Sequence, residues 1–360
     1  MNRKQFAILL ILVAVIGGAG LIIHQRGSQS WQGADQSAGQ KLLPNLAVND
    51  IAKITIQSGT NNLNLARQNN LWCVQERGGY PANFQQISDL LLKLADLKIV
   101  ESDDVGPSQL GRYNLLPPGP DTNTATVITF DDANGKALGS LLLGKKHMKK
   151  PAGGGDDEGW PDGRYVMVGV GNTGGGAVDL ISDSLDLVDP NPATWLNKDF
   201  LTINNPSSIS VQYPVTTNSW ALTRTSETND WQLANANLGE RLDSSKVSGV
   251  TSPFSSASFN DVFPPSTDPA TAGLTNTTTL TVKTLDGLSY TATIGSKQNG
   301  NYPLTLAVSA DVTSKANTNA LTKAQAFEHW IYQVPDYTVD PLLQTRAQLL
   351  ETNAPAVSNH

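Results

Sequence analysis

Apolar and polar residues alternate along many short stretches of this chain, and such a two-residue period is typical of β-strands that bury one face. Turn residues separate the stretches, so neighbouring stretches are predicted to pair as meanders and hairpins. Asn134–Gly135, between two of them, is a preferred two-residue hairpin turn. The strands predicted in the first half of the chain are residues 52–59, 62–68, 71–76, 125–132, 137–144 and 164–170.

Between the third and fourth of these strands the apolar period changes to three and four residues, which predicts an amphipathic helix. Asn83 precedes this helix and can cap it, because its side chain accepts hydrogen bonds from backbone N–H groups. The apolar face comprises Ile87, Leu90, Leu91, Leu94 and Leu97. We therefore expect the helix to cover one face of a sheet.

The second half of the chain repeats this order of segments. Trp231 and Leu274 have the same spacing as Trp72 and Leu115, and Asp286–Gly287 repeats the hairpin signal. The corresponding predicted strands are residues 208–214, 219–225, 230–235, 278–284, 289–295 and 302–308, with a helix at 243–250. Ordered agreement of this kind indicates an internal duplication.

Each predicted unit ends in a helix-like segment that contains a tryptophan, Trp195 in the first and Trp330 in the second. Residues 341–351 predict a last short amphipathic helix. Residues 147–163 have no counterpart in the second unit, so we interpret them as a loop inserted between strands of one copy.

Residues 6–23 are uncharged and almost wholly apolar. At about 1.5 Å per residue they are just long enough to cross a bilayer core as a helix. Arg3 and Lys4 precede this stretch, so the charge bias places the N-terminus in the cytoplasm. A cleaved signal peptide is the alternative, with Gly18 and Gly20 as small residues before the cut, but cleavage there would expose an apolar terminus.

The sequence therefore predicts an α+β fold of two tandem repeats, each a β-meander, a helix and a β-hairpin, preceded by one N-terminal transmembrane helix. The predicted topology is a single membrane pass, with the bulk of the chain outside the cytoplasm. The predicted parts are a membrane anchor at 1–26, a flexible linker at 27–41, a first unit at 42–204, a second unit at 205–336, and a helix and tail at 337–360.

The chain has 360 residues, a formal net charge of −7 and a single cysteine, Cys73. An acidic body disfavours nucleic acid as a partner, because like charges repel at long range. One cysteine excludes an intramolecular disulfide, so burial of apolar surface must stabilise the fold. Within its alternating stretch Cys73 is interpreted as a small packed side chain.

These segments resemble a bacterial protein family called domain of unknown function 4340. The resemblance covers nearly the whole chain and rests on the apolar N-terminus and on LLPNLAVNDIAKITI, YNLLPP, LLLG and PATWLNKDFL. It implies a membrane-anchored or exported protein, often encoded beside ABC-type transport components similar to those of gliding-motility systems. With the apolar N-terminus, it predicts a single-pass protein of the bacterial inner membrane whose bulk lies in the periplasm. The resemblance supplies no catalytic residues to carry over.

Chemically active residue types do not form a recognisable site in the sequence. Asp156, Asp157, Glu158 and Asp162 lie among glycines and raise the possibility of calcium binding, but their spacing fits no EF-hand, which favours a solvated loop. The histidines do not form a metal-binding pair; they are His24, His147, His329 and His360. The hydrolase, NTPase and dinucleotide signatures are missing. We predict no catalytic, cofactor-binding or metal-binding residues.

The leading functional hypothesis is a non-enzymatic accessory or scaffold protein of an ABC-type transport or cell-envelope complex, with an ABC-type permease or auxiliary subunit as partner and membrane contact through residues 6–23. The alternative is a module that binds an extracytoplasmic glycan or peptide between the units, to which Trp160 on the inserted loop would contribute. A hydrolase of envelope polymers is the weakest hypothesis, because paired acidic groups and nucleophile motifs are not visible.

Overall fold

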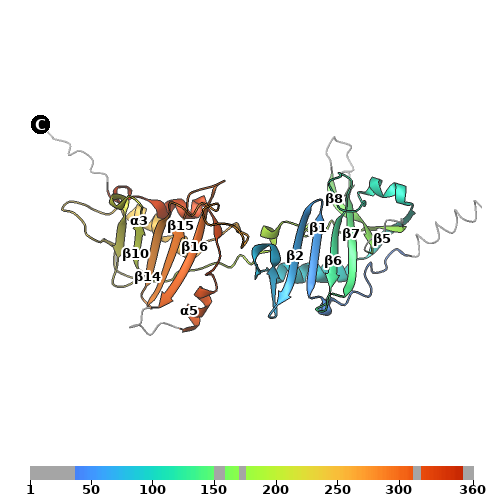
Figure 1. The fold of residues 1–360 in the computed structure, drawn as a ribbon, viewed down its shortest axis with the longest axis horizontal. Coiled ribbons are helices and arrows are strands. Elements are labelled where there is room, and N and C mark those ends of the chain that lie inside the picture. Colours follow the sequence, from blue (N-terminus) through green and yellow to red (C-terminus); the bar gives the residue numbers. More distant parts are fainter. Residues whose placement is uncertain (1–36, 150–158, 170–175, 311–317, 352–360) are drawn as a thin grey trace, which may run out of the picture. The chain divides into compact units, whose positions relative to one another are not determined.

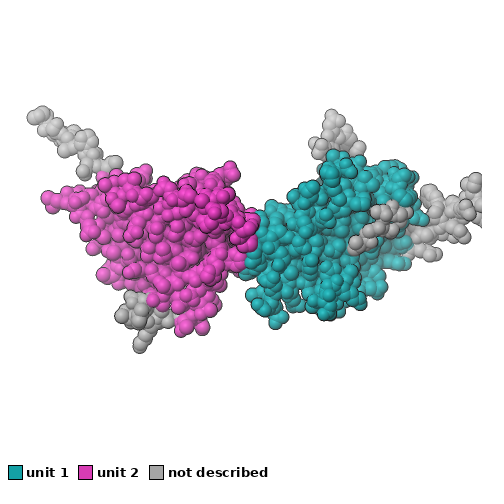
Figure 2. Space-filling model, in the orientation of Figure 1, with its two compact units in different colours: residues 1–195 teal, residues 196–360 magenta. Residues whose placement is uncertain are grey.

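The computed structural model describes residues 37–149, 159–169, 176–310 and 318–351. The chain divides into two compact units, residues 1–195 and 196–360 (Figure 2). The sequence placed this boundary after residue 204, a few residues further along the chain. Each unit is built around one large antiparallel sheet (Figure 1).

The sheet of the first unit has nine strands among the described residues, in the order β4-β3-β2-β1-β6-β7-β8-β9-β5. The strands are β1 (Lys53–Ser58), β2 (Asn61–Gln68), β3 (Leu71–Val74), β4 (Tyr80–Pro81), β5 (Ile99–Val105), β6 (Thr126–Asp131), β7 (Ala137–Lys149), β8 (Trp160–Val168) and β9 (Gly176–Ile181). One long helix accompanies them, α2 (Phe84–Asp96), with the short 3-10 helices η1 (Val48–Asp50), η2 (Gln75–Arg77), η3 (Pro107–Tyr113) and η4 (Pro192–Trp195).

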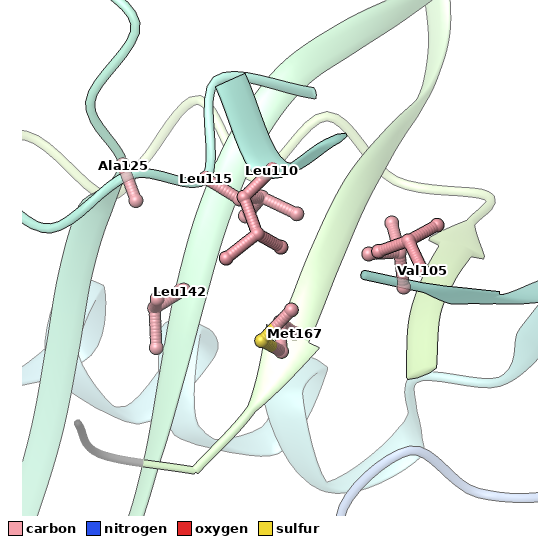
Figure 3. Close-up of a cluster of buried hydrophobic side chains, with 7 residues drawn as sticks. Val105, Leu110, Leu115, Ala125, Leu142 and Met167 are labelled. Atoms are coloured by element: carbon pink, nitrogen blue, oxygen red, sulfur yellow. The ribbon is translucent and has the colours of Figure 1, made fainter. Parts of the chain in front are cut away.

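Both faces of this sheet are buried. On β6, Ile128 and Phe130 are fully buried and pair with Ile56 and Ile54 of β1. Helix α2 runs behind these strands, with its predicted apolar face buried (Figure 1). The opposite face carries a second cluster, which η3 and the segment after it help to cover (Figure 3). Its buried members are Val105, Leu110, Leu115, Ala125, Leu142, Met167 and Val178.

The sheet of the second unit has eight described strands, in the order β12-β11-β10-β14-β15-β16-β17-β13. They are β10 (Pro206–Gln212), β11 (Trp220–Thr223), β12 (Gln232–Leu233), β13 (Asp261–Val262), β14 (Thr278–Thr284), β15 (Leu288–Ile294), β16 (Asn301–Ala310) and β17 (Tyr332–Pro335). The helices are short: α3 (Ser244–Thr251), α4 (Pro253–Ser256), α5 (Thr318–Gln325), α6 (Asp336–Val339), η5 (Thr216–Asn218), η6 (Asp340–Leu343) and η7 (Arg346–Leu349).

The two sheets share one strand order. Reading along each sheet, β3-β2-β1-β6-β7-β8-β9-β5 corresponds to β12-β11-β10-β14-β15-β16-β17-β13, and β4 is an additional edge strand of the first sheet. Backbone details follow the same register: Leu115 donates from its N–H to the carbonyl of Leu110, and Leu274 donates to that of Pro269. The ordered similarities in the sequence therefore have a counterpart in the topology.

The β7–β8 hairpin is longer than its counterpart. β7 continues to Lys149, which pairs with Trp160 of β8. In the second unit, Gln298 and Asn301 exchange two backbone hydrogen bonds of 2.8 and 2.9 Å and close a tight turn between β15 and β16. The segment interpreted as an inserted loop is thus partly an extension of two strands, which we call the extended hairpin (residues 145–149 and 160–165).

The predicted α+β class is wrong, because both units are mainly antiparallel β-sheet. Segments expected to be helical are short 3-10 turns or strands: Trp195 ends η4, and the stretch after Trp330 forms β17. Residues 341–351 form parts of η6 and η7 instead of one helix. The unpredicted strands β5, β9, β13 and β17 complete one end of each sheet.

The two unit-ending tryptophans are also not equivalent. Trp195 follows β9 and is fully buried, whereas Trp330 precedes β17 and is half-buried. The strands β9 and β17 occupy the same place in the two sheets. Trp195 comes after its strand in the sequence and Trp330 comes before its strand, so the two tryptophans are not at matching positions.

No helix in the described ranges is long and apolar enough to cross a membrane. This finding contradicts the predicted transmembrane helix and the predicted single-pass inner-membrane localisation. Residues 6–23, on which both predictions rested, lie outside the described residues.

Candidate functional site

The structure places only part of the predicted acidic loop. Asp162 lies on β8 and accepts a hydrogen bond at 2.6 Å from Nδ1 of His147 on β7. Asp156, Asp157 and Glu158 lie outside the described residues. Within the described ranges, no three histidine, cysteine or acidic side chains gather closely enough to hold a metal ion.

Cys73 is buried on β3, and its Sγ lies 3.7 Å from the carbonyl oxygen of Leu71. Burial raises the pKa of this thiol, because an apolar environment disfavours the thiolate. A thiol that resists ionisation is a poor nucleophile. The side chain therefore contributes to packing, as its place in the alternating pattern suggested.

Asp179 on β9 is the one strongly buried carboxyl among the described residues, at 6% exposure. Burial raises its pKa, and a hydrogen bond from Ser102 on the paired strand β5 offsets part of this effect. The folded state thus binds this proton more tightly than the unfolded state does. The associated stability is present at pH values below the ordinary carboxyl pKa of about 3.9 and is lost as pH rises through the raised value.

We therefore expect Asp179→Asn to be more stable than the wild type at pH 7, with a smaller difference at pH 3, below the ordinary carboxyl pKa, because only the wild type must bury a charge as pH rises. Urea unfolding at the two pH values measures the difference. Asp104→Asn, on the exposed side of β5, is the matched control and should change neither value appreciably. Equal effects of Asp179→Asn at both pH values would contradict a raised pKa of Asp179 in the folded protein.

A groove of about 200 Å³ runs along α2. Phe84 at its start and Leu92 two turns later are 63% and 58% exposed, which is unusual for large apolar side chains on a helix that covers a sheet. Ser88 lies between them on the same side of the helix. The lining residues are Val48, Asn49, Ile51, Arg67, Trp72, Phe84, Ile87, Ser88, Leu91 and Leu92.

A second, more polar depression of about 1070 Å³ adjoins this groove, and Asn49 and Arg67 line both. Its other walls are strand-end and loop residues at one end of the sheet, including the hairpin turn at Asn134–Gly135. An apolar groove bordered by polar groups has the composition of a protein-docking surface.

The corresponding helix of the second unit lacks the apolar groove residues. Side-chain caps fix the register: Asn83 accepts from the N–H of Gln86, and Asp243 accepts from that of Ser245. Counting from these caps, the buried residues of α2 meet apolar residues in α3, Ile87 with Val247 and Leu90 with Val250. The exposed residues do not, since Phe84 corresponds to Ser244 and Leu92 to Ser252, both exposed.

The two copies distinguish side chains that the fold requires from side chains that it does not require. A side chain that the fold requires should recur in both copies, and the buried residues of α2 do so except Leu91, which corresponds to the half-buried Thr251. Phe84 and Leu92 are apolar in one copy and serine in the other, so the fold does not require them. The sequence carried a signal for this site, because Phe84 and Leu92 lie beside the apolar stripe of the helix, but periodicity alone assigns them no role.

The second unit contains an apolar cavity of about 60 Å³ between its sheet and the short helices α4 and α6. Its walls are almost entirely hydrocarbon, and Thr338 is their only hydroxyl besides that of Tyr290. The space exceeds the roughly 10–15 Å³ that one water molecule needs, but its apolar walls offer a water almost no hydrogen-bond partners. We interpret it as a packing void.

Two of the residues singled out in the sequence are exposed. Trp160 on β8 is 53% exposed, close to the end of the extended hairpin. His329 is exposed and adopts a positive φ of 74° in the turn before β17. Trp160 is therefore available to a ligand, whereas His329 has the geometry of a turn residue.

Comparison with known proteins identifies a family. A family described as a domain of unknown function, DUF4340, matches residues 72–277, a range that begins in β3 and ends before β14. No curated protein and no solved structure matches the chain significantly.

Proposed function

The chain belongs to the family described as domain of unknown function 4340, and on that basis we propose that it is a non-enzymatic accessory protein that docks a protein partner in the groove along α2. The partner class that fits the family resemblance is a subunit of an ABC-type transport or cell-envelope complex. The observation that carries the proposal is the pair of exposed apolar side chains, Phe84 and Leu92, which the second copy replaces with serine.

Energetics support docking at this groove. Burying a large apolar side chain contributes about 1.5–3 kcal/mol, so two such anchors in a preformed groove can dominate a small interface. Arg67 and Asn49 at the border offer hydrogen-bond donors for orientation. The acidic charge of the chain adds repulsion against nucleic acid and anionic surfaces, which leaves a protein as the preferred occupant.

The test exchanges the groove residues for those of the second copy. A photo-crosslinking amino acid at Ser88, inside the groove, is expected to capture one transport-complex or envelope-complex subunit in the native host. Phe84→Ser combined with Leu92→Ser should reduce the adduct at least tenfold, because both apolar anchors are lost. Mass spectrometry identifies the adduct and quantifies it.

Leu238→Ser is the matched control, because Leu238 is fully exposed in the second unit and lies far along the chain from the groove. This variant should leave the adduct unchanged. An adduct that survives the paired serine substitutions, or the absence of any adduct at Ser88, would contradict docking at α2.

The exposed indole of Trp160 supports a second candidate function, capture of a glycan or peptide on the extended hairpin. Exposed aromatic faces are common parts of such sites, since they stack on apolar ring and side-chain surfaces. Titration with peptidoglycan fragments should quench tryptophan fluorescence, and Trp160→Ala should abolish the change. Quenching that persists in the variant would remove Trp160 from the site.

A further inference from the structure

Two tyrosine rings lie together on the first unit, at the base of the extended hairpin. Tyr113 ends η3 and Tyr165 lies on β8, and their ring centroids are 5.0 Å apart at an angle of 58°. Both side chains are only partly buried. The pair packs against the buried cluster of this face of the sheet, which fixes the rings from below.

The side chain of Lys145 on β7 places its ammonium over both rings. Its Nζ lies 5.2 Å from the centroid of Tyr113 and 5.4 Å from that of Tyr165, within the range of cation–π attraction. Within the described residues, no carboxylate is close enough to Lys145 to form an ion pair. The exposed lysine is therefore held by the rings and not by a salt bridge.

Carboxylates give the surroundings of the rings a negative potential. Tyr113 donates a hydrogen bond from Oη to Oδ2 of Asp103 at 3.4 Å. Burial first, and then the charge of Asp103 and its hydrogen bond, raise the pKa of Tyr113, and Arg112 opposes this effect. Glu101 and Asp103 on β5 both raise the pKa of Tyr165, after burial. A negative potential behind two π-faces favours a cation in front of them.

The second copy shows which part of this arrangement the fold needs. The strand pairing places Pro303 of β16 where β8 has Tyr165, since Val166 and Leu304 hold the same register in the two sheets. The register of the Leu115 and Leu274 hydrogen bonds likewise places the buried Ala272 where the first unit has Tyr113. The contact of Lys297 with the ring of Tyr302, at 5.7 Å, lies at other positions, and Lys297 there forms ion pairs with Asp336 and Asp340 at 2.8 and 3.4 Å. Neither ring of the pair therefore recurs in the second unit.

We propose that the Tyr113–Tyr165 pair is a recognition site for the side-chain ammonium of a lysine from a partner protein, and that Lys145 fills this site in the free protein. The inference goes beyond the proposed function, because the rings pack on the face of the sheet opposite α2 and are separate from the groove.

The test uses the full chain with its tyrosine rings labelled for NMR and two synthetic peptides. One peptide is acetyl-Gly-Gly-Lys-Gly-Gly-amide, and the other carries acetyl-lysine and is neutral. In Lys145→Ala the lysine peptide is expected to shift the Tyr113 and Tyr165 ring signals with a Kd at least tenfold lower than in the wild type. The neutral peptide should give no saturable shift.

Two further variants make the test specific. Lys145→Arg keeps a cation over the rings and should bind the peptide as weakly as the wild type. Tyr113→Leu in the Lys145→Ala background keeps an apolar side chain against the buried cluster but removes one ring, and it should abolish binding. Unchanged chemical shifts elsewhere show that this variant is folded.

Equal shifts with both peptides, or equal affinities of Lys145→Ala and Lys145→Arg, would overturn the proposal. Saturable binding of choline without binding of the lysine peptide would overturn the assignment to a protein lysine. Because the peptides do not involve Phe84 or Leu92, failure here leaves docking at α2 to stand or fall by its own crosslinking result.

Discussion

Trp195→Ala is expected to lower the free energy of unfolding of the first unit by about 3–5 kcal/mol, the range for truncation of a buried tryptophan. The indole is fully buried, and its Nε1 donates a hydrogen bond of 2.8 Å to the carbonyl of Asp189. Alanine would leave a cavity and would also remove this hydrogen bond to a half-buried carbonyl. Against a typical domain stability of 5–15 kcal/mol, the loss should be plain in urea unfolding followed by circular dichroism.

The position of Trp195 adds to this effect. Its carbonyl accepts a hydrogen bond of 2.8 Å from the N–H of Asn83, the cap residue of α2, so the tryptophan segment holds the start of the groove helix. Trp330→Ala is the comparison, because Trp330 is half-buried and is expected to matter less. Equal losses for the two variants would contradict the burial assigned to Trp195.

Gly144→Ala is expected to cost the first unit about 1–3 kcal/mol or more, the range for overpacking a filled interior. A Cβ at this position would lie 2.2 Å from the backbone carbonyl oxygen of Tyr113, and 3.0 Å from Leu115. The carbonyl of Tyr113 belongs to the backbone and cannot rotate away from the added Cβ as a side chain could. The end of the strand must therefore shift. Urea unfolding of the variant measures the cost.

The second copy repeats the constraint at Gly295, where a Cβ would lie 2.4 Å from the carbonyl oxygen of Gly273. Gly295→Ala should therefore destabilise the second unit by a similar amount. Gly106→Ala is the control in the first unit, since no atom lies within 4 Å of its added Cβ. A large effect of Gly106→Ala, or none at Gly144, would show that close approach is not the cause.

Much of the local structure follows from the sequence pattern. The predicted helix is α2, its cap is Asn83, and the hairpin turns fall at Gly135 and Gly287, both with positive φ. These features depend on contacts within a few residues, which the order of apolar and polar positions encodes directly. The resemblance to the DUF4340 family is confirmed as well.

The missed strands depend on distant partners. β5 contains Glu101, Asp103 and Asp104 and has no apolar alternation, yet it becomes a strand by pairing with β9 from far along the chain. β17 follows a tryptophan-bearing stretch that reads as a helix, and it becomes a strand because β16 offers it an edge. Tertiary pairing of this kind overrides local propensity, and this explains the wrong fold class.

The candidate sites were missed for a related reason. Phe84 and Leu92 are ordinary helix residues in the sequence, and only their exposure distinguishes them. Tyr113, Lys145 and Tyr165 come from three separate elements, so no motif spacing connects them. A contrast between the two copies at matched positions is the signal that would have found both, once a register between the helices was known.

The tight turn between β15 and β16 has a practical consequence for experiments. Asn299 and Gly300 occupy the place where the first copy accommodates a long excursion without loss of its sheet order. Because the β7–β8 hairpin tolerates extra residues at its tip, the matching β15–β16 turn of the second unit should accept a short affinity tag or fluorophore-binding peptide. This turn is therefore a rational location for an internal label in the second unit, which contains neither the groove residues nor the tyrosine pair.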